Sequence, residues 1–176
     1  MKTAFALLAS LSAVTAVTAY AQPRQSLVDI AVNDGRFSTL VTALQATGLD
    51  KAVADASEER PLTVFAPTND AFAKIDPSTL DNLLKNPTQL AGIIKLHVVR
   101  GLVSADSIVL RKRVPTLVGF IQCPTDSGCV DAHGRIKFFS ATPTTRGNTV
   151  SIAEEGIMAS NGMIHAIDSV LLPPAH

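Results

Sequence analysis

The chain has 176 residues, of which 47% are apolar and 17% charged, with 15 basic and 15 acidic side chains. This length corresponds to one domain, and the apolar fraction is large enough for a sizeable core. A net charge of zero gives no global field that would attract nucleic acid or an anionic membrane. The composition is also too apolar and too evenly charged for a disordered protein.

The first 21 residues have the pattern of a cleaved secretion signal. Lys2 gives a short positive start, residues 4–17 are almost wholly apolar or small, and Ala19-Tyr20-Ala21 fits the small-x-small rule of signal peptidase. The apolar stretch is short for a membrane span, which makes a retained anchor the weaker alternative. We expect one exported domain over residues 22–176, secreted or, in a Gram-negative source, periplasmic, with no transmembrane segment.

The two cysteines, Cys123 and Cys129, both fall in the exported part and enclose a short segment rich in turn residues. In an oxidising compartment a disulfide is the natural interpretation. A metal site is the alternative, and it is weaker because His133 is the only further ligand nearby, whereas structural zinc takes four.

The N-terminal half has helical periodicity. One apolar helical face, ended by Gly48, is formed by Phe37, Leu40, Val41 and Leu44. Asp76 before Pro77 predicts the start of a second helix, and Thr88 predicts the cap of a third that ends near His97. A buried strand is expected between the first two helices, at residues 62–66.

After residue 98 the pattern changes to short strands separated by turns. Strands are expected at residues 114–117, 136–139 and 150–152, and hairpin loops at residues 132–134 and 146–148. Asn161-Gly162 is the strongest turn signal, because both residues tolerate positive φ. The following strand, residues 163–172, is apolar on both faces and therefore central. Helices early and strands late predict an α+β fold.

Three segments carry a family resemblance: TVFAPTNDAF at residues 63–72, LHVVRG at residues 96–101, and NGMIHAID at residues 161–168, which VLLP follows. The first and last resemble the two signatures of the fasciclin domain, and the match extends over residues 25–174. The resemblance implies a wedge-shaped β-sandwich with a cluster of N-terminal helices. It also implies an adhesion or matrix-interaction role without a cofactor. The partners would be extracellular or cell-surface proteins, with matrix polysaccharide as a further class.

Most signature residues have a structural interpretation that needs no ligand. Structural roles are expected for Thr68 as a helix cap, for the turn residues and for two residues of the last strand, which gives the set Thr68, Asn161, Gly162, His165 and Asp168. Candidate partner contacts are Asn69 and Asp70, in an exposed first helical turn, and His97. For His97 a core histidine bonded to backbone is the stronger alternative.

No catalytic or metal-binding residue is expected. His165 and Asp168 do not form a dyad, because positions three apart along a strand point to opposite faces. The sequence contains no nucleophile elbow, zinc-protease helix or phosphate loop, and its histidines are scattered. A secreted enzyme is therefore the remote alternative to a binding module.

The sequence departs from the family at three places. Adhesive animal members carry an Asp-Ile dipeptide for integrin recognition where this chain has Gly156-Ile157, so integrin binding is not implied. Leu96 replaces the family's usual tyrosine, and the cysteine segment fits the family less well. A small-molecule or glycan binder stays open as an alternative, but aromatic residues usually line such sites, and the sole tyrosine, Tyr20, lies in the leader.

Export should remove the leader. We expect N-terminal sequencing of the secreted protein to begin at Gln22, because the small-x-small site ends at Ala21. An intact Met1 in the mature protein would contradict the assignment.

Overall fold

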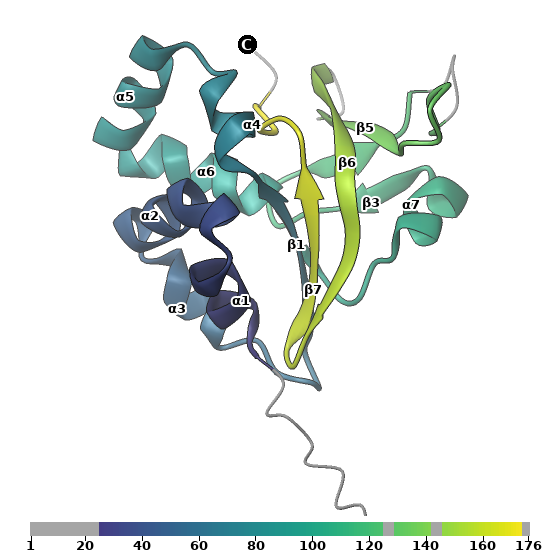
Figure 1. The fold of residues 1–176 in the computed structure, drawn as a ribbon, viewed down its shortest axis with the longest axis horizontal. Coiled ribbons are helices and arrows are strands. Elements are labelled where there is room, and N and C mark those ends of the chain that lie inside the picture. The colour runs from purple at the N-terminus through teal and green to yellow at the C-terminus, as the bar shows by residue number, and fades with distance from the viewer. Residues whose placement is uncertain (1–24, 125–128, 142–145, 174–176) are drawn as a thin grey trace, which may run out of the picture.

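The computed structural model describes residues 25–124, 129–141 and 146–173 and shows helices packed on a mixed sheet (Figure 1). The predicted leader lies outside these residues. The N-terminal half contains α1 (Leu27–Asn33), the 3-10 turn η1 (Gly35–Phe37), α2 (Ser38–Thr47), α3 (Leu49–Ala54), β1 (Leu62–Pro67), α4 (Asn69–Ala73), α5 (Pro77–Lys85) and α6 (Pro87–Leu96). The rest contains β2 (Val98–Arg100), α7 (Ala105–Arg111), β3 (Arg113–Pro115), β4 (Phe120–Gln122), β5 (Lys137–Ala141), β6 (Arg146–Ala159) and β7 (Gly162–Ile167). Within the described ranges, no helix has the length and apolar character needed to cross a bilayer.

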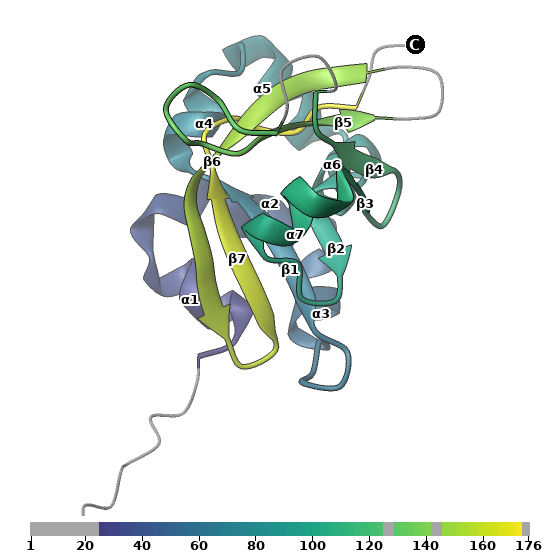
Figure 2. The same cartoon turned by 90° about the vertical axis from the view of Figure 1, so that its right-hand side faces the viewer.

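The strands form one continuous sheet in the order β2-β1-β7-β6-β5-β4-β3. β1 and β7 are parallel and in register from Leu62 opposite Gly162 to Pro67 opposite Ile167, and the other neighbours are antiparallel. The long strand β6 pairs with β7 along one part and with β5 along another, so the sheet folds over on itself (Figure 2). The expected α+β fold is confirmed, and its sandwich is built from one folded sheet.

The central strands β1 and β7 are buried on both faces. On one face Val64 and Ile164 pack into a core that the N-terminal helices cover. On the other face Phe65 and Ile167 pack into a second core, formed with the folded-over half of the sheet and α7. The prediction of a central last strand is confirmed.

The helix boundaries predicted at Gly48 and Asp76 are confirmed. Gly48 ends α2 with a φ of 68°, and Asp76 caps α5 with Pro77 as its first residue. The predicted cap at Thr88 is wrong, because Asn86 is the N-cap and Pro87 the first residue of α6. The fixed φ of proline suits the first helical position, which starts the helix before the threonine.

The strand boundaries in the C-terminal half differ from those expected. Residues 146–148, predicted as a loop, begin β6, and the last strand ends at Ile167 and not at residue 172. β7 ends early because the backbone after it bonds a side chain and not a neighbouring strand. The Nδ2 of Asn148 donates to the carbonyl of Val170, and its Oδ1 accepts from the Leu172 N–H. The predicted turn at residues 132–134 is confirmed. The strands expected at residues 114–117 and 136–139 are each shifted, to β3 and β5.

The turn at Asn161-Gly162 is present, but the predicted reason for it is wrong. Neither residue has a positive φ. Gly162 is required because a Cβ at this position would overlap the carbonyl oxygen of Leu62 in the neighbouring strand. Close approach of two backbones, and not left-handed geometry, therefore determines the glycine.

Gly162→Ala should lower the free energy of unfolding by at least about 2 kcal/mol, because the added methyl group meets backbone that cannot move without shifting β1. Gly92→Ala is the matched control, since no atom lies within 4 Å of its added Cβ. Gly92 lies inside α6, so alanine there should stabilise the protein by about 0.5–1 kcal/mol. Urea unfolding of both variants tests the difference, and an unchanged midpoint for Gly162→Ala would contradict the packing argument.

Candidate functional site

The two signatures meet at one edge of the sheet. Because β1 and β7 are parallel, the residues that follow them lie side by side. The Thr68 N–H donates to the carbonyl of Ile167 at 3.3 Å, and the Thr68 hydroxyl accepts from the Ala71 N–H as the cap of α4. Lys74 Nζ donates to the carbonyl of Asp168 at 2.7 Å. The chain ends of both signatures thus form one surface.

Asn69 is half-buried at this edge, not exposed as expected. Its Oδ1 accepts from the Thr39 N–H at 3.1 Å and from the Ser38 hydroxyl at 3.2 Å, and its Nδ2 donates to the carbonyl of Gly35 at 2.9 Å. The carboxamide therefore ties the start of α4 to the start of α2. Position 69 needs an asparagine because its carboxamide bonds backbone about thirty residues earlier in the chain. A local sequence pattern does not reveal such a distant contact.

Two carboxylates, those of Asp34 and Glu154, pair with one arginine, Arg36. Arg36 donates to Asp34 at 2.7 Å and to Glu154 of β6 at 2.6 Å. Its hydrogen bond holds the pKa of the Asp34 carboxyl below the ordinary value. Asp70 is exposed in the first turn of α4, next to Asn69. We call the four residues Arg36, Asn69, Asp70 and Glu154 the signature surface.

His165 is fully buried in β7 and occupied at both ring nitrogens. Nε2 donates to the carbonyl of Val103 at 2.7 Å, Nδ1 accepts from the Gly156 N–H at 3.1 Å, and the ring stacks on Phe65. Asp168 lies beyond the end of the strand, where its Oδ1 accepts from the Ser151 N–H at 3.0 Å. The two side chains serve different backbone groups and form no dyad.

His97 has the opposite tautomer. It is 2% exposed, its Nδ1 donates to the carbonyl of Ile93 at 2.8 Å, and its Nε2 accepts from the Leu171 N–H at 2.9 Å. The imidazole thus joins the end of α6 to the segment that follows β7. With both nitrogens used inside the protein it has no surface to offer a partner, so we leave it out of the signature surface.

Comparison with known proteins agrees with this arrangement. The sequence model of the fasciclin domain matches residues 35–173. The chain belongs to the fasciclin domain family. Rabbit (Oryctolagus cuniculus) transforming growth factor-beta-induced protein ig-h3 is 35% identical over 88% of this chain, and the match spans only 20% of ig-h3.

Bacterial relatives match over more of their own length. The uncharacterized protein sll1735 of Synechocystis is 37% identical over 84% of this chain and 97% of its own, and the immunogenic protein MPB70 of Mycobacterium bovis is 32% identical over 86% and 71%. A solved FAS1 domain pair from the insect cell adhesion molecule fasciclin I superposes with a TM-score of 0.65 over 86% of this chain and 52% of that one. At 16% identity, this last likeness shows the fold alone.

Two departures from the family pattern have structural roles in this fasciclin domain. Gly156 adopts a φ of 71° in a bulged part of β6, where its N–H donates to His165. An aspartate here would have to adopt a conformation that favours glycine. Leu96 is 4% exposed, so the side chain that replaces the usual tyrosine lies in the interior and not on a binding surface.

Cys123 and Cys129 form a disulfide, with their Cα atoms 4.9 Å apart. The metal site considered for them with His133 is therefore wrong, because the two sulfurs bond each other. Both cysteines are buried in the second core. Among the residues that the structure describes, no cluster of three metal-ligating side chains occurs.

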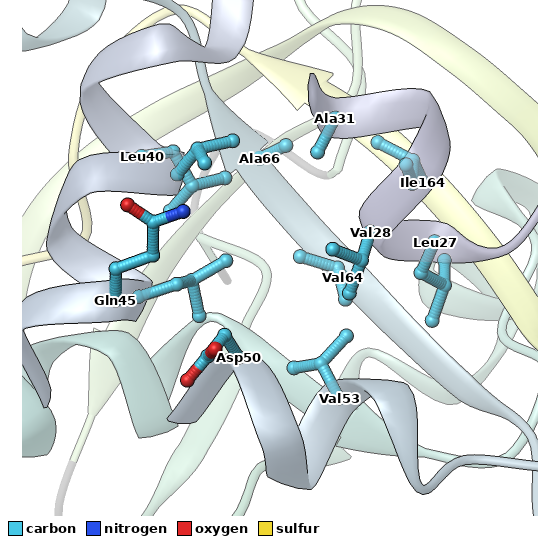
Figure 3. Close-up of a pocket in the computed structure, with 12 residues that line it drawn as sticks. Leu27, Val28, Ala31, Leu40, Gln45, Asp50, Val53, Val64, Ala66 and Ile164 are labelled. Carbon is cyan, nitrogen blue, oxygen red and sulfur yellow. The ribbon is translucent and has the colours of Figure 1, made fainter. Parts of the chain in front are cut away.

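An apolar pocket of about 60 Å³ lies between the N-terminal helices and the central strands (Figure 3). Aliphatic side chains from α1, α2 and α3 face Val64 and Ile164, with Gln45 and Asp50 as its polar members. Its lining holds no aromatic ring on which a sugar could stack, and its volume suits only a small group. The pocket therefore does not favour the glycan-binding alternative.

The protein should lose stability between pH 7 and pH 5 through His97. Burial lowers the pKa of His97 from 6.5 to about 4, so the unfolded chain takes up a proton in a range where the folded protein resists it. The free energy of unfolding should fall by about 2 kcal/mol by pH 5. Urea unfolding at both pH values should show a loss about 2 kcal/mol larger in the parent than in His97→Gln, and an equal loss in both proteins would contradict the assignment.

Proposed function

We propose that this fasciclin domain is a secreted, non-catalytic module that binds proteins at or outside the cell surface through the signature surface. The observation that carries the proposal is that most polar signature residues bond groups inside the protein, while one stays exposed. Thr68, His165 and Asp168 make hydrogen bonds within the fold, whereas Asp70 stays exposed next to Asn69, whose carboxamide bonds the carbonyl of Gly35 beside Arg36.

Three further findings support this role. The family includes the insect fasciclin I, described as a cell adhesion molecule. The disulfide between Cys123 and Cys129 is of a kind that persists in oxidising compartments. The backbone contacts of Asn69 hold α4 firmly, so Asp70 would meet a partner without first being ordered, which lowers the entropic cost of binding.

Replacing Asp70 should reduce binding and leave stability nearly unchanged. We expect Asp70→Lys to lower retention of the secreted protein on intact cells or cell-free matrix about tenfold, because a like-charge contact replaces a favourable one. Its melting temperature should change by only a few degrees, since an exposed charge in a first helical turn contributes about 0.3–1 kcal/mol. Glu58→Lys, an equal charge change at another exposed position, is the matched control and should retain the parent's binding.

Two outcomes would contradict the proposal. Equal retention of Asp70→Lys and the parent would place the binding surface elsewhere. Failure of the parent to be retained, together with ligand-induced stabilisation by a small molecule or glycan from a panel, would favour the small-molecule alternative.

A further inference from the structure

The region around the disulfide is strongly basic in a chain whose net charge is zero. Residues 111–137 contain two acidic residues, Asp126 and Asp131, and five basic ones, Arg111, Lys112, Arg113, Arg135 and Lys137. This local excess of positive charge lies in the segment that departs most from the family signatures. Neither the signatures nor the signature surface accounts for it.

The fold places the two basic segments on either side of the disulfide. The Cys123 N–H donates to the carbonyl of Lys112 at 2.9 Å, and the Lys137 N–H donates to the carbonyl of Cys129 at 2.7 Å. Both cysteines are buried, so the bridge is a fixed point between α7 and β5. Cations distant in sequence are thereby held within one region of the surface.

The side chains of Arg113 and Lys137 lie on the same face of the sheet. Val114 and Phe138 point into the second core, so their neighbours Arg113 and Lys137 point outward. Arg113 is opposite Gln122, and Gln122 is opposite Phe139, two residues from Lys137. From Arg113 to Lys137 the path crosses two gaps between neighbouring strands and then runs two residues along β5. These two distances, at right angles, put the Cα atoms of Arg113 and Lys137 about 12 Å apart. α7, β3 and β5 lie away from helices α1 to α3 (Figure 1).

The local structure constrains two of the cations. The Arg113 guanidinium lies 3.4 Å from the centroid of the Phe120 ring, which fixes its direction. Lys112 has a φ of 57° and is the one non-glycine residue with positive φ in the part of the chain that the structure describes. This is the left-handed conformation in which helices commonly end, and Lys112 is the C-cap of α7.

The charges of one basic segment are not neutralised by the protein. Asp131 contacts Arg135 at 3.3 Å and Lys137 at 3.6 Å. Within the described residues, Arg111, Lys112 and Arg113 take part in no ion pair, and all three are exposed. They are therefore available to an external anion.

We propose that Arg111, Lys112, Arg113, Arg135 and Lys137 form a binding surface for an anionic, sulfated polysaccharide. The cations are spread over an open surface on two segments, a distribution that suits a linear polyanion carrying repeated charges. Guanidinium groups pair well with sulfate and carboxylate oxygens. This surface goes beyond the proposed function, because it contains no residue of the signature surface and takes a different class of partner.

A structural role predicts something else for the same residues. Arg111 and Lys112 stand at the C-terminal end of α7, where positive charge favours the helix dipole. That role would make their loss a small change in stability without an effect on binding. The two roles therefore separate in an experiment that measures both quantities.

The test uses the full secreted protein and immobilised heparin as the sulfated probe. The variant combines Arg111→Gln, Lys112→Asn and Arg113→Gln, with asparagine chosen because it tolerates the positive φ at position 112. The matched control removes three exposed cations elsewhere, through Lys51→Gln, Arg60→Gln and Lys85→Gln. We expect the parent and the control to bind heparin with similar affinity, and the triple variant to bind about tenfold more weakly with a melting temperature lowered by only a few degrees.

The experiment also includes neutral agarose, as a matrix without sulfate groups, and anionic phospholipid vesicles, as a competing anionic surface. Leu110, adjacent to the basic segment and 82% exposed, makes a membrane surface the main competitor. Binding to vesicles of phosphatidylserine and phosphatidylcholine that exceeds binding to heparin would overturn the polysaccharide assignment, as would equal losses in variant and control. Asp70→Lys should bind heparin like the parent, so a failure of this proposal is distinguishable from a failure of the signature surface.

Discussion

The parallel pairing of β1 with β7 is the constraint on which the rest of this fold depends. The two strands are distant in the chain, from residues 62–67 and 162–167, and lie in register over six residue pairs, with Gly162 allowing the closest approach. Apolar cores cover both of their faces, so water cannot satisfy polar groups there. Every buried polar side chain in the described ranges accordingly has a hydrogen-bond partner inside the protein.

This constraint explains why a recognisable signature can say so little about a partner. His165 and His97 each join two separate backbone segments, using opposite tautomers, and Asn161 joins the starts of α1 and β7 to α3 through Leu27 and Val53. These signature residues bond backbone groups inside the fold, where burial on both faces of the central strands excludes water. Under the proposed function, recognition of other molecules falls to exposed groups that the central strands position but do not require.

The sequence predicted best those features that neighbouring residues decide. Gly48 and Asp76 act within one helical turn, and the central last strand follows from its own apolar pattern. Asn69, Asn148 and Gly162 were misread because each serves a segment distant in the chain: the start of α2, the residues after β7, and the backbone of β1. A single sequence contains the residue type at such a position but not the distant group that it contacts, so the exposed position of Asn69 and the length of the last strand were both wrong.

The disulfide illustrates how a small energetic contribution can have a larger structural consequence. It closes a short loop, so the chain-entropy model gives it only about 2 kcal/mol. Its position is more informative than this stabilisation, because the backbones of Cys123 and Cys129 bond to Lys112 and Lys137 on two different elements. The disulfide is buried and lies between the end of β4 and the start of β5, so it ties together backbone that contacts both basic segments. The bridge therefore joins the backbone next to Lys112 to the backbone next to Lys137, which is the arrangement that the proposed basic surface requires.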